Sequence, residues 1–242
     1  MAEFKRFFVD KIEPCTVLSG DEFEHAKNVL RLKVGDEVVL LDNSGKEYSA
    51  VIATIEKRSM SLNVLGETDG DKEAKEEIAL AFGYLKNADK NEFIVQKAVE
   101  LGVKRIIAFS SDFSSAYMNE NKLERLNKVA KESAKQCLRS VAPIVEYMPF
   151  EKVLLSAKEY KNRIFACEFA TESETDLSRV DGKTFLIVGS EGGFSREEAE
   201  NAKNVGFAWV TLGKRILRAE TAAVALTSVV AFSLGELGER LK

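Results

Sequence analysis

The spacing of apolar residues at the start of the chain is typical of short β-strands. A mostly apolar run over Val38–Asp42 and an alternating run over Glu47–Ile55 flank the turn-forming residues 43–45. This arrangement predicts a hairpin, and Met60–Leu65 predicts a further strand. A short helix is expected over Glu22–Leu30. This part of the chain therefore indicates a small β-barrel or sandwich.

A polar segment separates this part from the rest. Residues 66–77 contain no large apolar side chain and carry many charges, which is the composition of a linker. The chain has 242 residues, which is enough for two domains. We therefore expect a small domain over residues 1–72 and a larger one over residues 73–242.

Beyond the linker, predicted strands and helices alternate. Strands are expected over Ile78–Leu85, Lys104–Ser110, Arg163–Cys167, Phe185–Gly189 and Ala208–Leu212, and helices over Asn91–Leu101, Asn121–Leu138, Arg196–Val205 and Ala219–Leu234. Such alternation predicts an α/β fold with a mainly parallel sheet covered by helices. In sheets of this kind, ligands bind in the loops at the carboxyl ends of the strands.

The charge totals conceal an uneven distribution. The chain holds 35 basic and 39 acidic residues, for a net charge of −4. Residues 1–72 hold 10 basic and 14 acidic residues, so the larger domain is neutral. The acidic total therefore does not exclude an RNA partner, because a basic surface can lie on one part of the molecule.

The rare residue types exclude several kinds of chemistry. His25 is the sole histidine, so a multi-histidine metal site is impossible and a histidine-centred triad is not expected. The three cysteines form no C-x-x-C pair, and the longest mainly apolar stretch, Ala222–Phe232, is too short to span a bilayer. We expect a cytoplasmic protein with neither a metal site nor a membrane anchor.

Two glycine-containing loops are the candidates for a ligand site. The strand ending at Gly189 leads into SEGGFS, whose Gly192 and Gly193 permit close approach of the backbone to a ligand, and Ser195 with Glu198 forms a capping box for the next helix. The glycines alone would equally suit an ordinary βα loop. The second loop, within Val210–Ala222, places three cations in five residues, which can hold phosphate or a developing anion. We favour a pocket shared by the two loops.

Basic residues gather on one face of the predicted helix Asn121–Leu138. At helical spacing, one face receives Arg125, Lys128, Lys131, Lys135 and Arg139. A charge run of this kind is most often a solvated helix face, but the nearly single sign of the charge favours contact with a polyanion. The basic pair Lys5-Arg6 lies beside Phe4, Phe7 and Phe8, which suits either nucleic acid or a strand that enters a core.

Five segments together resemble the RsmE family, which are 16S ribosomal RNA uracil-N3 methyltransferases of the SPOUT class. The segments are RFFVD (6–10), HAKNVLRLKVGDEV (25–38), QKAVELGV (96–103), LIVGSEGGFS (186–195) and LGKRILRAETA (212–222). The resemblance covers nearly the whole chain, and the two C-terminal motifs are specific as a pair.

The resemblance implies a fold, a cofactor and a substrate. The N-terminal part would be a PUA-like β-barrel that helps to hold RNA. The rest would be an α/β domain of SPOUT type with helices on both faces of its sheet and a deep trefoil knot near its end, which only the resemblance supports because knots are very rare. The cofactor would be S-adenosylmethionine, the enzyme a homodimer, and the product N3-methyluridine in the decoding region of 16S rRNA in the small ribosomal subunit.

Carried over by position, the resemblance also implies site residues. Those expected to line the cofactor are Leu186, Val188, Gly189, Ser190, Glu191, Gly192, Leu212, Gly213, Ile216, Leu217 and Arg218. Those expected to touch RNA are Arg6, Arg31, Lys128, Lys135, Gln136 and Arg139. Arg218 and Arg6 are the expected catalytic cations, since a cation that faces the uracil carbonyls would stabilise the anion left by loss of the N3 proton.

One position departs from the family pattern. Where the family usually has a Ser-(acid)-Arg-Ser stretch, this chain has Ser111-Asp112-Phe113-Ser114, so Phe113 replaces an arginine. Two other functions stay open on the sequence alone. One is an RNA-binding or ribosome-assembly factor without enzymatic activity, which the basic helix supports and the paired glycine loops do not. The other is a SPOUT methyltransferase that acts on a different RNA site.

Overall fold

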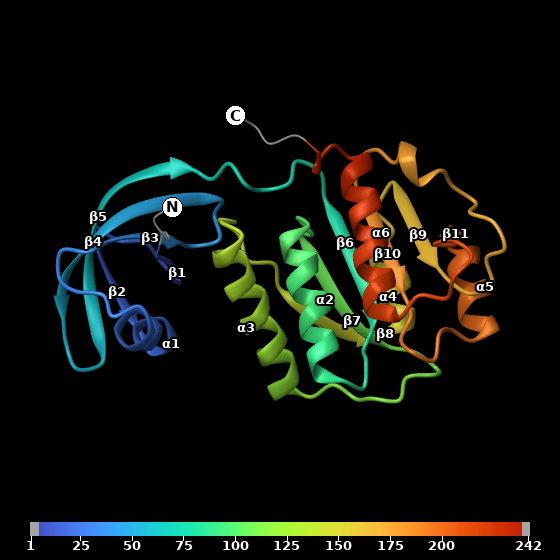
Figure 1. Ribbon diagram of the computed structural model, residues 1–242, viewed down its shortest axis with the longest axis horizontal. Helices are drawn as coiled ribbons and strands as arrows, with labels where there is room; N and C mark the ends of the chain where they lie inside the picture. The colour runs from blue at the N-terminus through green and yellow to red at the C-terminus, as the bar shows by residue number, and fades with distance from the viewer. Residues whose placement is uncertain (1–4, 239–242) are drawn as a thin grey trace. The chain divides into compact units, whose positions relative to one another are not determined.

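The computed structural model describes residues 5–238 and divides into two compact units (Figure 1). Unit 1 comprises residues 1–73 together with 134–142, and unit 2 comprises residues 74–133 and 143–242. The domain ranges 1–72 and 73–242 stay a prediction. No sequence pattern indicates that residues 134–142 belong to unit 1.

Unit 1 is built on a five-stranded sheet with the order β1-β3-β4-β5-β2. The strands are β1 (Arg6–Phe8), β2 (Cys15–Ser19), β3 (Glu37–Leu41), β4 (Lys46–Ile55) and β5 (Ser59–Asp69). β1 pairs with β3 in parallel, and the remaining pairs are antiparallel. The predicted hairpin is confirmed as β3 and β4. Phe7 and Phe8 are buried in β1, so these two aromatics belong to a strand that enters the core, whereas Phe4 lies outside the described residues.

Two elements of unit 1 differ from the predictions. β5 runs to Asp69, four residues into the predicted linker, because Lys46–Ser49 of β4 supply its backbone partners and Lys46 forms an ion pair with Glu67. This end of β5 is exposed and lacks an apolar periodicity. The predicted helix Glu22–Leu30 is shorter as an α-helix, α1 (Gly20–Glu24), and continues as a π-helical turn, η1 (His25–Val29).

Ion pairs join residues 134–142 to Glu22 of α1 and to Glu73, which follows β5. The Lys135 ammonium lies 3.1 Å from Glu22 Oε2, and the Arg139 guanidinium lies 2.8 Å from Glu73 Oε2. Glu73 Oε1 also accepts hydrogen bonds from the backbone N–H groups of Ser140 and Val141. Loss of one partner would leave a buried charge uncompensated, which makes these pairs costly to break.

Unit 2 contains a six-stranded sheet with the order β11-β9-β10-β6-β7-β8, and every pair in it is parallel. The strands are β6 (Ile78–Gly83), β7 (Arg105–Ser110), β8 (Val145–Pro149), β9 (Asn162–Ala166), β10 (Thr184–Val188) and β11 (Ala208–Val210). The helices are α2 (Ala88–Glu100), α3 (Glu120–Gln136), α4 (Phe150–Ser156), the short 3₁₀ helix η2 (Leu177–Arg179), α5 (Arg196–Asn204) and α6 (Ala219–Ser233). The predicted α/β class is confirmed.

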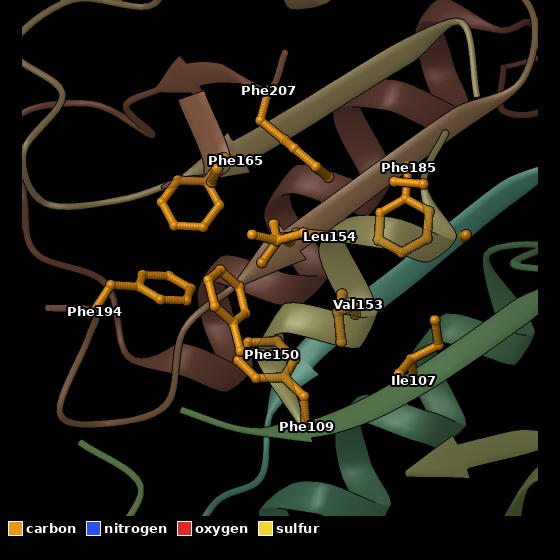
Figure 2. Packing of buried hydrophobic residues seen from close by; sticks show 14 of the residues in the cluster. Ile107, Phe109, Phe150, Val153, Leu154, Phe165, Phe185, Phe194 and Phe207 are labelled. Carbon is orange, nitrogen blue, oxygen red and sulfur yellow. The ribbon is translucent and has the colours of Figure 1, made fainter. Parts of the chain in front are cut away.

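Helices cover both faces of this sheet. α2 and α6 lie side by side against one face, where α6 contacts β6 and β10 (Figure 1). On the other face, α4 and α5 pack over a cluster rich in phenylalanine (Figure 2). The Phe165 and Phe194 rings are 4.3 Å apart between centroids, and Phe150 lies 5.4 Å from Phe194. Central strands buried on both faces explain the nearly continuous apolar runs at 78–82 and 184–188.

The sequence analysis did not predict β8 or α4. β8 is an edge strand that carries Glu146 and ends at Pro149, and edge strands tolerate both residue types. α4 has only seven residues, too few for a helical periodicity to stand out. Its Phe150, Val153 and Leu154 nevertheless complete the phenylalanine-rich cluster.

Candidate functional site

A cavity of about 790 Å³ opens at the carboxyl ends of β9, β10 and β11. Three loops line it, at residues 166–171, 188–194 and 210–219, together with Lys90 and Ala222. β9 lies between β10 and β11, so the two glycine loops follow strands that are not neighbours but flank a third. The predicted shared pocket is present, and the loop after β9 is part of it.

The loop after β10 is folded tightly by its glycines. Gly193 has φ +68° and donates its N–H to the Ser190 carbonyl at 3.0 Å, which closes a turn. At Gly189, a Cβ would lie 2.9 Å from the Phe194 ring, so a side chain there would collide with the core. The backbone of this loop therefore lies bare along the cavity, where its N–H and C=O groups can meet a ligand.

Ser190 offers an unpaired polar atom to the cavity. The residue is buried, and its hydroxyl has no hydrogen-bond partner within the described chain. A buried hydroxyl without a partner is costly, so a ligand that hydrogen-bonds to it would relieve that cost.

The position of Ser190 depends on Gly83 at the end of the neighbouring strand β6. A Cβ at Gly83 would lie 2.4 Å from the Ser190 backbone nitrogen and 2.9 Å from its Cβ. Real Cβ contacts do not approach so closely, and a backbone atom cannot turn away as a side-chain end can. Glycine is therefore required at position 83.

The loop after β9 contributes residues that the sequence analysis did not single out. The Glu168 carboxylate accepts a hydrogen bond from the Phe194 N–H at 3.2 Å and so ties this loop to the loop after β10. Cys167 is half-buried beside it, and burial raises the pKa of its thiol. The only sequence signal was the position of these residues directly after a predicted strand.

The loop after β11 brings cations and the N-terminus of α6 to the cavity. Lys214, Arg215 and Arg218 are exposed there, and none of them is held in an ion pair within residues 5–238. Arg218 is the N-cap residue of α6, and its side chain makes no capping hydrogen bond. A helix N-terminus and several cations make this side of the cavity suitable for an anionic group.

Lys90 reaches the same cavity from the first turn of α2. Its ammonium lies 3.1 Å from Glu220 Oε1. Desolvation opposes ionisation of Glu220, but its own backbone N–H and Lys90 together lower the pKa of its carboxyl below the ordinary value. Glu220 is therefore a carboxylate that holds Lys90 at the edge of the cavity.

Two family models and several relatives match the chain. A model described as an RNA methyltransferase domain matches residues 72–231, and one described as an RNA methyltransferase PUA domain matches residues 18–65. Ribosomal RNA small subunit methyltransferase E of Mesomycoplasma hyopneumoniae is 33% identical, over 91% of this chain and 96% of that protein. The chain belongs to the ribosomal RNA small subunit methyltransferase E family.

Other members of the methyltransferase E family agree with this assignment. The Bacillus subtilis member is 29% identical, over 94% of this chain and 96% of its own length. The structure of the Neisseria gonorrhoeae member, solved bound to S-adenosyl methionine, has a TM-score of 0.82 at 25% identity and covers 96% of this chain and 98% of its own. The resemblance to RsmE, the PUA-like domain and the α/β fold of SPOUT type are thereby confirmed, while the trefoil knot stays a prediction.

Most residues that the methyltransferase E resemblance assigns to the cofactor line the cavity. They are Val188, Gly189, Ser190, Glu191, Gly192, Leu212, Gly213, Ile216, Leu217 and Arg218. Leu186 is instead fully buried in β10 and does not line the cavity. Their roles towards a cofactor stay predictions.

The residues expected to touch RNA fall into two groups. Arg31, Lys128 and Gln136 are exposed. Arg6, Lys135 and Arg139 are buried within unit 1. Arg6 donates two hydrogen bonds to Glu47, at 2.7 and 3.1 Å, and a third to the Arg139 carbonyl at 3.5 Å. These contacts favour a structural role for the buried group, and all six RNA contacts, like catalysis by Arg6, stay predictions.

Replacement of Gly83 tests the close approach of β6 to the loop after β10. Gly83→Ala should force the Ser190 backbone to shift and lower the free energy of unfolding by about 1–3 kcal/mol, the usual cost of overpacking. Urea denaturation followed by circular dichroism measures the change. Gly66→Ala is the matched control, because its Cβ would meet nothing closer than Ser49 Oγ at 3.8 Å. Equal stability of the two variants would contradict the constraint at position 83.

Proposed function

We propose that this chain transfers the methyl group of S-adenosylmethionine to N3 of a specific uridine in the decoding region of 16S ribosomal RNA. The observation that carries the proposal is the cavity formed by the glycine loop and the cation-bearing loop, in a chain of the methyltransferase E family. Bound there, S-adenosylmethionine supplies a methyl group made electrophilic by the positive sulfur.

The residues of the cavity suit that cofactor chemically. Val188, Leu212 and Leu217 offer apolar surface, and the glycine loop offers backbone donors and acceptors, as an adenosine group requires. The unpaired Ser190 hydroxyl can donate to or accept from a polar group of the cofactor. The α6 N-terminus, together with Lys214 and Arg215, suits the carboxylate of its methionine part.

Arg218 is the residue to which we assign charge stabilisation. Uracil N3 carries a proton that must pass to solvent water, because the nitrogen can attack a methyl group only with the lone pair left by the loss of that proton. The negative charge then spreads over N3 and the two carbonyl oxygens. A guanidinium facing those oxygens would stabilise the anion without any histidine base, and the rest of the catalysis would come from alignment of the reacting atoms.

The PUA-like domain and α3 are the parts to which we assign RNA binding. Arg31 of unit 1 is exposed and has φ +53°, a backbone conformation uncommon for a residue with a side chain. Lys128 and Gln136 are exposed on α3. Cations on these surfaces can meet the phosphates of the RNA backbone.

We also propose that the chain acts as a homodimer through the face formed by α2 and α6. Phe93, Val229 and Phe232 are exposed on these two helices, and Phe232 is 67% exposed. An apolar face on adjacent helices indicates an interaction surface. The double variant Phe93→Asp/Phe232→Asp should convert a dimer into a monomer in multi-angle light scattering, and a wild-type chain that is already monomeric would contradict the proposal.

Calorimetry and RNA mass spectrometry test the proposed activity together. The chain should bind S-adenosylmethionine, and small-subunit RNA from a deletion strain should lack one N3-methyluridine that the purified chain restores. If the chain binds S-adenosylmethionine but restores a methyl group at a different nucleotide, the enzyme acts on a different RNA site from the one proposed. No binding at high cofactor concentration would favour an assembly factor without enzymatic activity.

Removal of the Arg218 guanidinium tests its assigned role. Arg218→Ala should lower kcat about 100-fold or more, the usual effect of losing one group that stabilises a developing anion, while cofactor affinity in calorimetry stays largely intact. Arg179→Ala is the matched control, since Arg179 is an exposed arginine of unit 2 that does not line the cavity. Unchanged turnover in Arg218→Ala would refute the assignment.

A further inference from the structure

A tight turn after β7 lies against the glycine loop of the cavity. The Ser111 N–H donates to Ser114 Oγ at 2.7 Å, and the Ser114 N–H donates to the Ser111 carbonyl at 3.0 Å. Both ends of the four-residue stretch 111–114 are thus fixed to each other. The two residues between them, Asp112 and Phe113, are presented at the tip.

A second set of contacts fixes this turn to the start of α5. The Asp112 N–H donates to Glu198 Oε1 at 2.8 Å, and the Ser195 hydroxyl donates to Asp112 Oδ2 at 2.7 Å. Glu198 is 7% exposed and also accepts from the Ser195 N–H, which completes the capping box of α5. Burial raises the pKa of the Glu198 carboxyl. The turn therefore has a fixed place beside residues 189–195.

Phe113 lies directly against the cavity loop in consequence. A Cβ at Gly192 would be 2.8 Å from the Phe113 carbonyl oxygen and 2.9 Å from its Cβ, so glycine is needed for the two segments to meet. Gly192 itself lines the cavity. The Phe113 side chain is nevertheless 53% exposed, although burial of a phenylalanine is worth about 1.5–3 kcal/mol.

The contacts that hold Phe113 in place do not involve its ring. The atoms that approach Gly192 are the carbonyl oxygen, the carbonyl carbon and Cβ, all of which an alanine would keep. The backbone and Cβ contacts are thus sufficient to hold the turn against the loop, and the exposed aromatic ring is not needed for this packing. In proteins that bind single-stranded RNA, exposed aromatic rings serve as surfaces on which unpaired bases stack.

We propose that the Phe113 ring is a stacking platform for an unpaired base of the RNA substrate, beside the loop of Gly192 that lines the cavity. The proposal rests on the proposed function, because it needs RNA at this cavity. An arginine, which the family usually has here, also stacks on bases through its guanidinium plane. Phenylalanine keeps the stacking surface and gives up the charge, so binding through this residue should not depend on salt.

Steady-state kinetics with unmethylated small ribosomal subunits provide the first test. Phe113→Ala should raise the KM for the subunit about 5- to 150-fold, the fold-change that corresponds to loss of one base–aromatic stack. The affinity for S-adenosylmethionine and the melting temperature should not change, because the contacts with Gly192 are kept. Phe113→Tyr and Phe113→Trp should restore the KM, whereas Phe113→Leu, which is apolar but not aromatic, should not.

Fluorescence provides a second test that does not depend on turnover. The chain has a single tryptophan, the buried Trp209, so the wild-type signal serves as the blank for Phe113→Trp. Decauridylate should quench the new tryptophan, and a decamer of abasic ribose phosphates should not. As a control, Leu155→Ala removes an exposed apolar side chain from α4. This variant should keep the wild-type KM for the subunit and the wild-type fluorescence in the presence of decauridylate.

The outcomes separate the two proposals. A wild-type chain that neither binds S-adenosylmethionine nor methylates the subunit overturns the proposed function. A wild-type chain that methylates normally, with an unchanged KM in Phe113→Ala, overturns stacking alone. A wild-type KM in Phe113→Leu would show that the side chain acts only through its apolar volume and would also overturn stacking. Equal quenching of the Phe113→Trp fluorescence by decauridylate and by the abasic decamer would overturn it as well.

Discussion

The end of β6 and the start of the loop after β10 meet so closely that a side chain at position 83 would collide with Ser190. This contact fixes where Ser190 begins the glycine loop. Because every strand of the sheet runs in the same direction, the ends of β9 and β11 arrive at the same edge. The pairing of the central strands therefore determines where the cavity lies, and the loops supply the residues that line it.

The glycine loop is also held in place by one of its own residues, which packs into the core. Phe194 leaves the loop and enters the phenylalanine-rich cluster between Phe150 and Phe165 (Figure 2). The glycines let the backbone lie close to this ring, and Glu168 holds the Phe194 N–H from the neighbouring loop. A segment rich in glycine is thus held rigidly, and a rigid loop loses little entropy when a ligand binds.

Elements with a strong apolar pattern were predictable from the sequence, as were the paired glycine loops of the site. The elements that were missed lacked such a pattern: α4 is short, β8 is a polar edge strand, and the end of β5 is exposed. Glu168 and the pairing of Asp112 with Ser195 depend on tertiary contacts between distant segments. The burial of Lys135 and Arg139 was also not predictable, because the sequence does not distinguish an exposed lysine or arginine from one that is paired with a carboxylate in the interior.

Residues 134–142 have a consequence for how such a chain can evolve. The polypeptide crosses between the units at three points, after Glu73, Ser133 and Ala142. A fragment that ends at residue 72 would lack Lys135, which forms an ion pair with Glu22, and the Arg139 carbonyl, which accepts a hydrogen bond from Arg6. Transfer of unit 1 to another protein would therefore require both of its chain segments, residues 1–73 and residues 134–142.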